Sequence, residues 1–425
     1  MKVNRFTEEV LDEFKARANT HQTHMEDLVL LGHEGIEELN DKIDKFIERI
    51  NGQANGTLMV GKIDGAPAVV CWSKFEGYPD NSISLKSFQT SNKNCLSTFE
   101  DIESKYGDRP DMATKLRYCL ELARCIPEGE AWQGDCLYSS NDKRETEIDG
   151  TIYLTFHPNK IVYAFSEDNP NYEKVKNSDF GIYFHTIYTG DLEHKSQSFN
   201  VDASRLNNVP ENIYVISPAI TGIDASKNKE DFDLTKINDL YEQLKVAEDD
   251  LISDPNYEPL IENRVFMDYW NTFENASLSD KQATTLNTET FFSDLKEYIR
   301  NKQDKAYTKK LDTLKTDAGR QKAADKYQLE IQEMDDLLSQ DQDVLYKLVK
   351  CLNLAATIKM ALWAGLKNAR QIYKSFYLHR EKGYIPASIE GVSYNDADGN
   401  IVKIVDRSSF SNVNRSSDYL SGFEH

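Results

Sequence analysis

The sequence predicts an α+β protein in which strand-rich segments lie on both sides of a long helical region. Short runs rich in β-branched and aromatic residues occupy residues 57–75 and 147–165, with a His157-Pro158-Asn159 turn in the second. Residues 224–383 instead follow a helical period and are rich in Lys, Asp, Gln and Ala. Strand-like runs return after residue 383, which favours antiparallel sheets combined with a separate block of helices.

The elements follow one another in a clear order. Residues 1–52 are expected to be helical, as a packing or docking element, because apolar residues recur at spacings of three and four: Ile36, Leu39, Ile43, Phe46, Ile47 and Ile50. Strands are then expected over 57–75, a helix over 111–125, a strand around Asp135, and a hairpin or meander over 147–165. A hairpin is expected over 388–405, with its turn at Asp396-Ala397-Asp398-Gly399-Asn400.

Composition indicates a folded protein of two or three domains, with 425 residues of which 39% are hydrophobic. No run approaches the roughly 20 apolar residues of a membrane span, and the first residues lack a signal-peptide core, so we expect a cytoplasmic protein. The six cysteines show no paired CxxC spacing, and neither disulfides nor zinc is expected. His21 and His24 near Glu26-Asp27 suggest a polar helix entrance rather than a metal site.

The formal net charge of -21 is unfavourable for binding a polyanion, yet the charge is strongly patterned. Residues 344–383 contain eight Lys or Arg against one Glu, which gives +7, and residues 296–326 contain ten against five, which gives +5. Acidic residues gather over 230–262. We therefore expect the two basic stretches to form a face that could guide a nucleic acid.

The chemistry is concentrated in a turn between two apolar runs, Gly61-Lys62-Ile63-Asp64-Gly65. A lysine whose pKa is lowered by burial and neighbouring cations can act as a nucleophile on phosphorus. Further segments follow in order: Gln133-Gly134-Asp135-Cys136, Tyr183-Phe184-His185-Thr186, Ile389-Glu390-Gly391-Val392 and Val402-Lys403-Ile404-Val405-Asp406-Arg407. This series resembles the motif set of the covalent nucleotidyltransferases, namely ATP-dependent DNA ligases, RNA ligases and mRNA-capping guanylyltransferases. The sequence as a whole resembles phage-encoded members of this superfamily.

The resemblance implies a role for each motif residue. Lys62 would form the lysyl-nucleotide, and Asp64 and Gly65 would complete its turn. Asp135, where the family usually has Glu, would hold the ribose hydroxyls, and Phe184 would stack on the purine. Glu390 would bind a divalent metal and Lys403 the α-phosphate. The remaining phosphate contacts are assigned to Lys86, where the family has Arg, and to Arg407, because Val405 occupies the place of a second lysine.

Each residue also has a simpler interpretation. Lys62 could cap a solvated turn, Asp135 could end a strand and Phe184 could be a core residue. Glu390 and Lys403 could form a cross-strand pair. A second acid-Gly sequence, Glu147-Ile148-Asp149-Gly150-Thr151, precedes the Phe184 segment and is interpreted as a strand entrance.

The resemblance further implies a ligase-type nucleotidyltransferase domain with a large helical insertion, because Phe184 and Glu390 lie 206 residues apart. The expected division is an N-terminal helical element (1–55), a first core segment (56–223), the insertion (224–383) and C-terminal core strands (384–425). The short stretch after the last motif favours an RNA-ligase layout over one with a further OB-fold.

The function expected from this layout is an ATP-dependent ligase for RNA rather than DNA. Its cofactors would be ATP and Mg²⁺ or Mn²⁺, and the choice between ATP and GTP stays open. It would work in the cytoplasm, that of the host if the protein is phage-encoded, without a membrane. The alternatives are nucleotidyl transfer to another acceptor, or a non-catalytic nucleotide-binding or assembly protein that retains the fold. A protein partner could bind through the helical regions.

Overall fold

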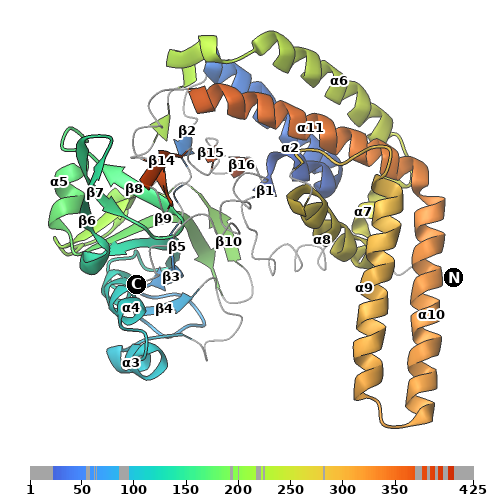
Figure 1. Cartoon of the computed structure of the whole chain (residues 1–425), viewed down its shortest axis with the longest axis horizontal. Coiled ribbons are helices and arrows are strands. Elements are labelled where there is room, and N and C mark those ends of the chain that lie inside the picture. The colour runs from blue at the N-terminus through green and yellow to red at the C-terminus, as the bar shows by residue number, and fades with distance from the viewer. Residues whose placement is uncertain are drawn as a thin grey trace.

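The protein combines helices with three largely antiparallel sheets, as the sequence predicts for an α+β chain. Figure 1 shows the two kinds of structure side by side, with the strands on one side and the long helices on the other. The computed structural model describes residues 23–53, 58–61, 63, 65–85, 95–191, 195–199, 201–216, 222–223, 225–280, 283–368, 376–380, 383–387, 391–395 and 401–405.

The N-terminal helices join the core of the helical part. The 3-10 helix η1 (Met25–Leu31) leads directly into α2 (Gly32–Ile50), and both contribute buried apolar side chains to the same hydrophobic cluster. The expected stripe on α2 is confirmed. Ile47 is half-buried, and the other five members of the stripe are fully buried: Ile36, Leu39, Ile43, Phe46 and Ile50. Residues 1–22 of the expected N-terminal helix lie outside the described residues.

Sheet B forms the centre of the strand-rich part, with helices α3 (Phe99–Tyr106) and α4 (Pro110–Ala123) packed on one face. Thr98 caps α3 in a reciprocal capping box with Asp101. Pro110 begins α4, at a position where the backbone N–H that proline lacks would have no partner within the helix. The strands are β3 (Ala68–Trp72), β4 (Ser82–Leu85), β5 (Glu130–Ser139), β9 (Phe180–Gly190), β10 (Lys195–Ser198) and β11 (Ile213–Ile216).

Sheet C continues the strand-rich part with the meander expected over 147–165. Its strands are β6 (Arg144–Ile148), β7 (Thr151–Phe156), β8 (Ile161–Phe165), β13 (Phe376–Arg380) and β14 (Gly383–Pro386), next to the short helix α5 (Tyr172–Asn177). Asp149 and Gly150 both have positive φ and join β6 to β7, as a two-residue type I′ hairpin requires. The acid-Gly sequence is therefore a hairpin turn, not a strand entrance alone.

Sheet A collects strands from both ends of the chain. Its order is β1 (Thr23–His24), β16 (Ile401–Val405), β15 (Gly391–Asn395), β2 (Leu58–Gly61) and β12 (Gly222–Ile223). The predicted C-terminal hairpin is present, because β15 and β16 pair antiparallel. Val392, Val402 and Ile404 of this sheet belong to the hydrophobic cluster of the helices. The helical part is thus packed directly on sheet A.

The helical part leaves sheet A after β12 and returns to the sheets through β13. It comprises the 3-10 helix η6 (Ala225–Asp231) and helices α6 (Leu234–Ile252), α7 (Tyr257–Glu262), α8 (Arg264–Asp280), α9 (Phe291–Thr313), α10 (Asp317–Gln340) and α11 (Gln342–Asn368). The domain boundary expected at residue 383 falls inside the β13–β14 hairpin of sheet C. That boundary is too late, because β13 already pairs with β8 from Phe376 onwards.

Helix α11 is the central helix of this part. By length and composition residues 342–366 could span a membrane, but 61% of the apolar 18-residue window within them is buried inside the protein. It contacts α6 and η1 along its length, and Figure 1 shows it running beside α2 and α6. We therefore interpret α11 as the core helix of this part.

Candidate functional site

The motif turn crosses from sheet A to sheet B. Strand β2 ends at Gly61 and β3 begins at Ala68, and the chain between them contains Lys62 and Asp64, which lie outside the described residues. Backbone hydrogen bonds attach the second half of this turn to β5: Ala66 N donates to Cys136 O over 2.8 Å, and Cys136 N donates to Pro67 O over 3.0 Å. The turn is therefore held against the strand that contains Asp135.

Gly65 makes this close approach possible. A Cβ atom added at Gly65 would lie 2.4 Å from the carbonyl oxygen of Cys136 and 3.1 Å from the Cβ of Asp135. The first distance is shorter than a real Cβ contact, and the obstacle is backbone rather than a movable side chain. A glycine is needed here because two backbone segments touch. The fold therefore requires a glycine at the last position of the Lys-x-Asp-Gly sequence.

The C-terminal motifs lie on β15, which pairs with β2, and on β16, the next strand of sheet A. Gly61 pairs with Val392 in β15, and Ser393 pairs with Lys403 in β16. Lys62 follows Gly61 in sequence and Glu390 precedes Gly391, so the two motifs adjoin strand ends that are neighbours in sheet A. Glu390 itself lies outside the described residues, and Lys403 is described only as a backbone position.

Asp135 is paired with a histidine that the sequence analysis did not assign. The carboxylate oxygen Oδ2 of Asp135 lies 3.8 Å from His185 Nε2, with the side chains 13% and 19% exposed respectively. His185 Nδ1 shares a 2.8 Å hydrogen bond with Thr186 Oγ1, which fixes the orientation of the ring. An acid and an imidazole with restricted exposure at one place can hold hydroxyl groups or exchange a proton.

Tyr183 supplies the aromatic ring next to this pair. It is the register partner of Asp135, and its ring centroid is 6.1 Å from that of His185. Burial raises the pKa of the Tyr183 hydroxyl, and the charge of Asp135 adds to the increase. Tyr183 therefore remains a neutral phenol at physiological pH.

Phe184 does not lie with Asp135, which corrects the role expected for it. Its side chain is fully buried in the core between sheet B and α4, where it meets Trp132 edge-on with ring centroids 5.6 Å apart. Successive residues of a strand face opposite sides, so Tyr183 and His185, not Phe184, share a side with Asp135. A ring enclosed in the core has no free face for a purine.

The remaining expected contacts are not described. Lys86 follows β4, which ends at Leu85, and Arg407 follows β16, which ends at Val405; both lie outside the described residues. Within the described ranges, no group of three or more His, Cys, Asp or Glu side chains is arranged to hold a metal ion. Asp135 is the one described carboxylate of the proposed set, so these residues alone do not make a metal centre.

Two cations of the basic stretch 344–383, Lys347 and Lys359, do not belong to the expected open face. Lys347 is bound to three carboxylates, those of Asp254 at 2.8 Å, Asp343 at 3.1 Å and Asp250 at 3.6 Å. These contacts raise the pKa of Lys347, with the hydrogen bond to Asp254 as the largest cause. Lys359 is 3% exposed and pairs with buried Glu26. Two cations of this stretch are therefore structural. The side chain of Lys367 and residues 370, 374 and 382 lie outside the part of the chain that the structure describes.

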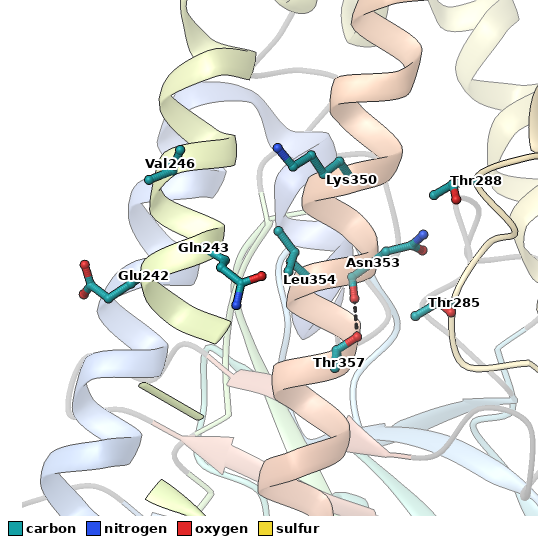
Figure 2. Close-up of a pocket in the computed structure, with 9 residues that line it drawn as sticks. All are labelled: Glu242, Gln243, Val246, Thr285, Thr288, Lys350, Asn353, Leu354 and Thr357. Carbon is teal, nitrogen blue, oxygen red and sulfur yellow. Dashed lines mark hydrogen bonds between the residues drawn. The ribbon is translucent and has the colours of Figure 1, made fainter. Parts of the chain in front are cut away.

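A separate groove of about 620 Å³ lies in the helical part. Figure 2 shows side chains from α6, α11 and the segment after α8 around it, lined by Glu242, Gln243, Val246, Thr285, Thr288, Lys350, Asn353, Leu354 and Thr357. Asn353 fixes one wall, because it both donates to and accepts from the backbone of Leu286 over 2.8 Å. None of the motif residues that the structure describes lines this groove.

Comparison with known proteins places the chain in one family. The family matched by residues 19–418 covers most of the chain and is described as a family of unknown function, DUF6267. The chain belongs to DUF6267. No curated protein and no solved structure matches this DUF6267 member.

Proposed function

We propose that this DUF6267 member is an ATP-dependent RNA ligase that works through a lysyl-AMP intermediate at Lys62. The observation that supports the proposal is the convergence of ordered motifs at one junction. Gly61, Val392 and Lys403 lie on three adjacent strands of sheet A. Gly65 packs on Asp135 of sheet B directly after the lysine turn. Motifs up to 342 residues apart in sequence are thus adjacent in the fold, as a catalytic site requires.

The proposed reaction proceeds in three balanced steps. The neutral Lys62 amine attacks the α-phosphorus of ATP, a P–N bond forms, the bond to pyrophosphate breaks, and the amine releases a proton. A 5′-phosphate oxygen of RNA then attacks the same phosphorus, so that AMP leaves Lys62 and caps the RNA end. Finally a 3′-hydroxyl attacks the capped phosphate, AMP departs, and the hydroxyl proton is released.

Asp135 and His185 would act on the nucleotide's sugar, and Lys403 and Glu390 on its phosphates. Asp135 presents a hydrogen-bond acceptor beside His185, whose ring nitrogen can donate or accept a hydrogen bond. The two side chains are therefore suited to hold ribose hydroxyl groups. Lys403, on the strand next to β15, would approach the α-phosphate and neutralise developing charge. A divalent metal, for which Glu390 is the expected ligand, would supply further charge neutralisation at the phosphates.

Covalent labelling tests this proposal. The purified protein should become radioactive when incubated with ATP labelled at the α-phosphate and Mg²⁺ or Mn²⁺, and acid should release the label. Lys62→Ala should abolish labelling, whereas Lys105→Ala, at an exposed position of α3, should label like the wild type. Labelled GTP in parallel decides the nucleotide. A label that persists in Lys62→Ala would contradict the proposal.

The second candidate is a nucleotide-binding protein without catalysis. It is favoured by the buried position of Phe184, which removes one expected contact to the purine. In that case calorimetry would detect ATP binding that Asp135→Asn weakens, while no covalent label forms under any metal. Labelling and calorimetry on the same preparation therefore separate the two candidates.

A further inference from the structure

Helices α9 and α10 form an arm that extends away from the rest of the protein (Figure 1). They contain 23 and 24 residues, which at about 1.5 Å per residue gives a length of about 35 Å. At the base, Leu295, Ile299 and Leu338 are buried in the core of the helical part. Between residues 304 and 330 no side chain is buried. We call residues 304–330 the arm tip.

The arm tip is ordered by contacts between its two helices. The rings of Tyr307 and Tyr327 stack with centroids 4.3 Å apart and planes 12° from parallel. Tyr327 also donates to Asp304, and Gln303 at the edge of the tip donates to Glu330 O over 3.2 Å. The tyrosine rings stack on each other, which occupies one face of each ring. The arm tip is thus a two-helix rod that presents its other side chains to solvent.

Charge along the arm is sharply separated. The arm tip contains seven Lys or Arg and five Asp or Glu, which gives +2 in a chain of net -21. Within it, residues 305–322 contain six Lys or Arg and two Asp, which gives +4. Residues 328–343, which lead back to the base, contain six acids and no Lys or Arg. The exposed cations are Lys305, Lys309, Lys310, Lys315, Arg320 and Lys322. This separation concentrates positive potential at the far end of the arm.

Helix stability accounts for only some of these cations. Lys309 and Lys310 lie near the end of α9, where the helix dipole favours positive charge. Arg320 and Lys322 lie near the start of α10, where the dipole favours acids instead. Lys309, Lys315 and Lys322 also make no ion pair with the described part of the chain, in contrast to Lys347 and Lys359.

We propose that the arm tip binds the sugar–phosphate backbone of the RNA substrate. Its exposed cations match a phosphodiester chain, so contact is expected at the backbone, without sequence preference. A lipid surface fits less well, because Leu329 is the one exposed large apolar side chain that the arm tip offers for insertion. The choice of RNA rests on the proposed function, whereas polyanion binding by the arm tip does not.

Fluorescence anisotropy with a labelled 5′-phosphorylated RNA stem-loop tests the proposal. The test variant is Lys309→Gln/Lys315→Gln/Lys322→Gln, and the control is Lys105→Gln/Arg124→Gln/Lys236→Gln, which removes the same charge at exposed positions outside the arm. The test variant should bind about tenfold or more weakly, and its slope of log Kd against log salt should fall by about 2 to 3, from roughly 0.7–0.9 per lost phosphate contact. The control should bind like the wild type.

The outcomes distinguish this proposal from the proposed function. Wild-type affinity and slope in the test variant, or equal weakening in the control, would overturn it. Tighter binding to DNA of the same sequence would overturn the choice of RNA, and loss of binding to phosphatidylserine vesicles without loss of RNA binding would replace RNA with a membrane. Self-labelling with ATP should be unchanged in the test variant. Failure of labelling in the wild type would remove the ligase but leave arm binding intact.

Discussion

Asp135 and Phe184 occupy paired strands yet face opposite sides of sheet B. The strand pattern placed both residues on strands, and the simpler interpretation of Phe184 as core holds. The side could not be predicted, because Tyr183, Phe184 and His185 form a run without polar alternation. A register shift between Gln133 and Gly134 also changes which neighbours meet across β5 and β9. His185 was present in the motif, but only this geometry connects it to Asp135.

Glu248 gives a prediction at the same scale. It is 2% exposed in α6, its Oε2 accepts from Asn40 over 2.8 Å, and its Oε1 has no hydrogen-bond partner among the described residues. Burial raises the pKa of this carboxyl above its usual 4.5. The folded state therefore holds the proton more tightly than the unfolded state, so the wild type loses stability as pH rises through the raised pKa.

Glu248→Gln removes this loss. The variant should melt at a higher temperature than the wild type at pH 7, and the difference should shrink as the pH falls to about 4, where the carboxyl is protonated in both states. Glu242→Gln, whose side chain is 74% exposed, is the matched control and should change little. Thermal unfolding followed by circular dichroism from pH 4 to 8 measures the effect. A melting difference that is independent of pH would contradict this explanation.

At the scale of elements, local periodicity was sufficient where an element depends on its own sequence. The α2 stripe and the β15–β16 hairpin follow directly from spacing and turn residues. The β13–β14 hairpin was missed because its partner, β8, lies more than 200 residues earlier, and strand pairing of that kind leaves no local signal. The same reason explains Lys359, whose partner Glu26 lies 333 residues away.

The Glu26–Lys359 pair joins η1 to α11 and predicts a large effect on stability. Lys359→Met should lower the free energy of unfolding by about 3–5 kcal/mol, because it leaves a carboxylate buried without its cation. The double variant Glu26→Gln/Lys359→Met should recover much of that loss. Lys45→Met, which breaks a partly exposed pair with Asp41, should cost about 1 kcal/mol or less. Urea unfolding measures all three, and equal losses for the single and double variants would refute a role for the uncompensated charge.

At the scale of the whole molecule, the order of the motifs predicted which segments belong together, and the helices between β12 and β13 explain their separation in sequence. What the sequence could not provide is how the junction is built. Gly65 touches the backbone of β5, and β2 lies between β12 and β15. Both arrangements depend on contacts between segments that are distant in sequence. The charge pattern was misleading for Lys347 and Lys359 of α11, because ion pairs across elements are not visible in a count of charges.

Mapping the attachment site of AMP tests the central claim most directly. After incubation with ATP and Mg²⁺, proteolysis and mass spectrometry at neutral pH should find one AMP per chain, attached to the side chain of Lys62 and lost on acid treatment. Asp135→Asn should lower the extent of modification without moving it. AMP attached to a different residue, or a chain that binds ATP but remains unmodified, would contradict a lysyl-nucleotide mechanism at the junction of sheets A and B.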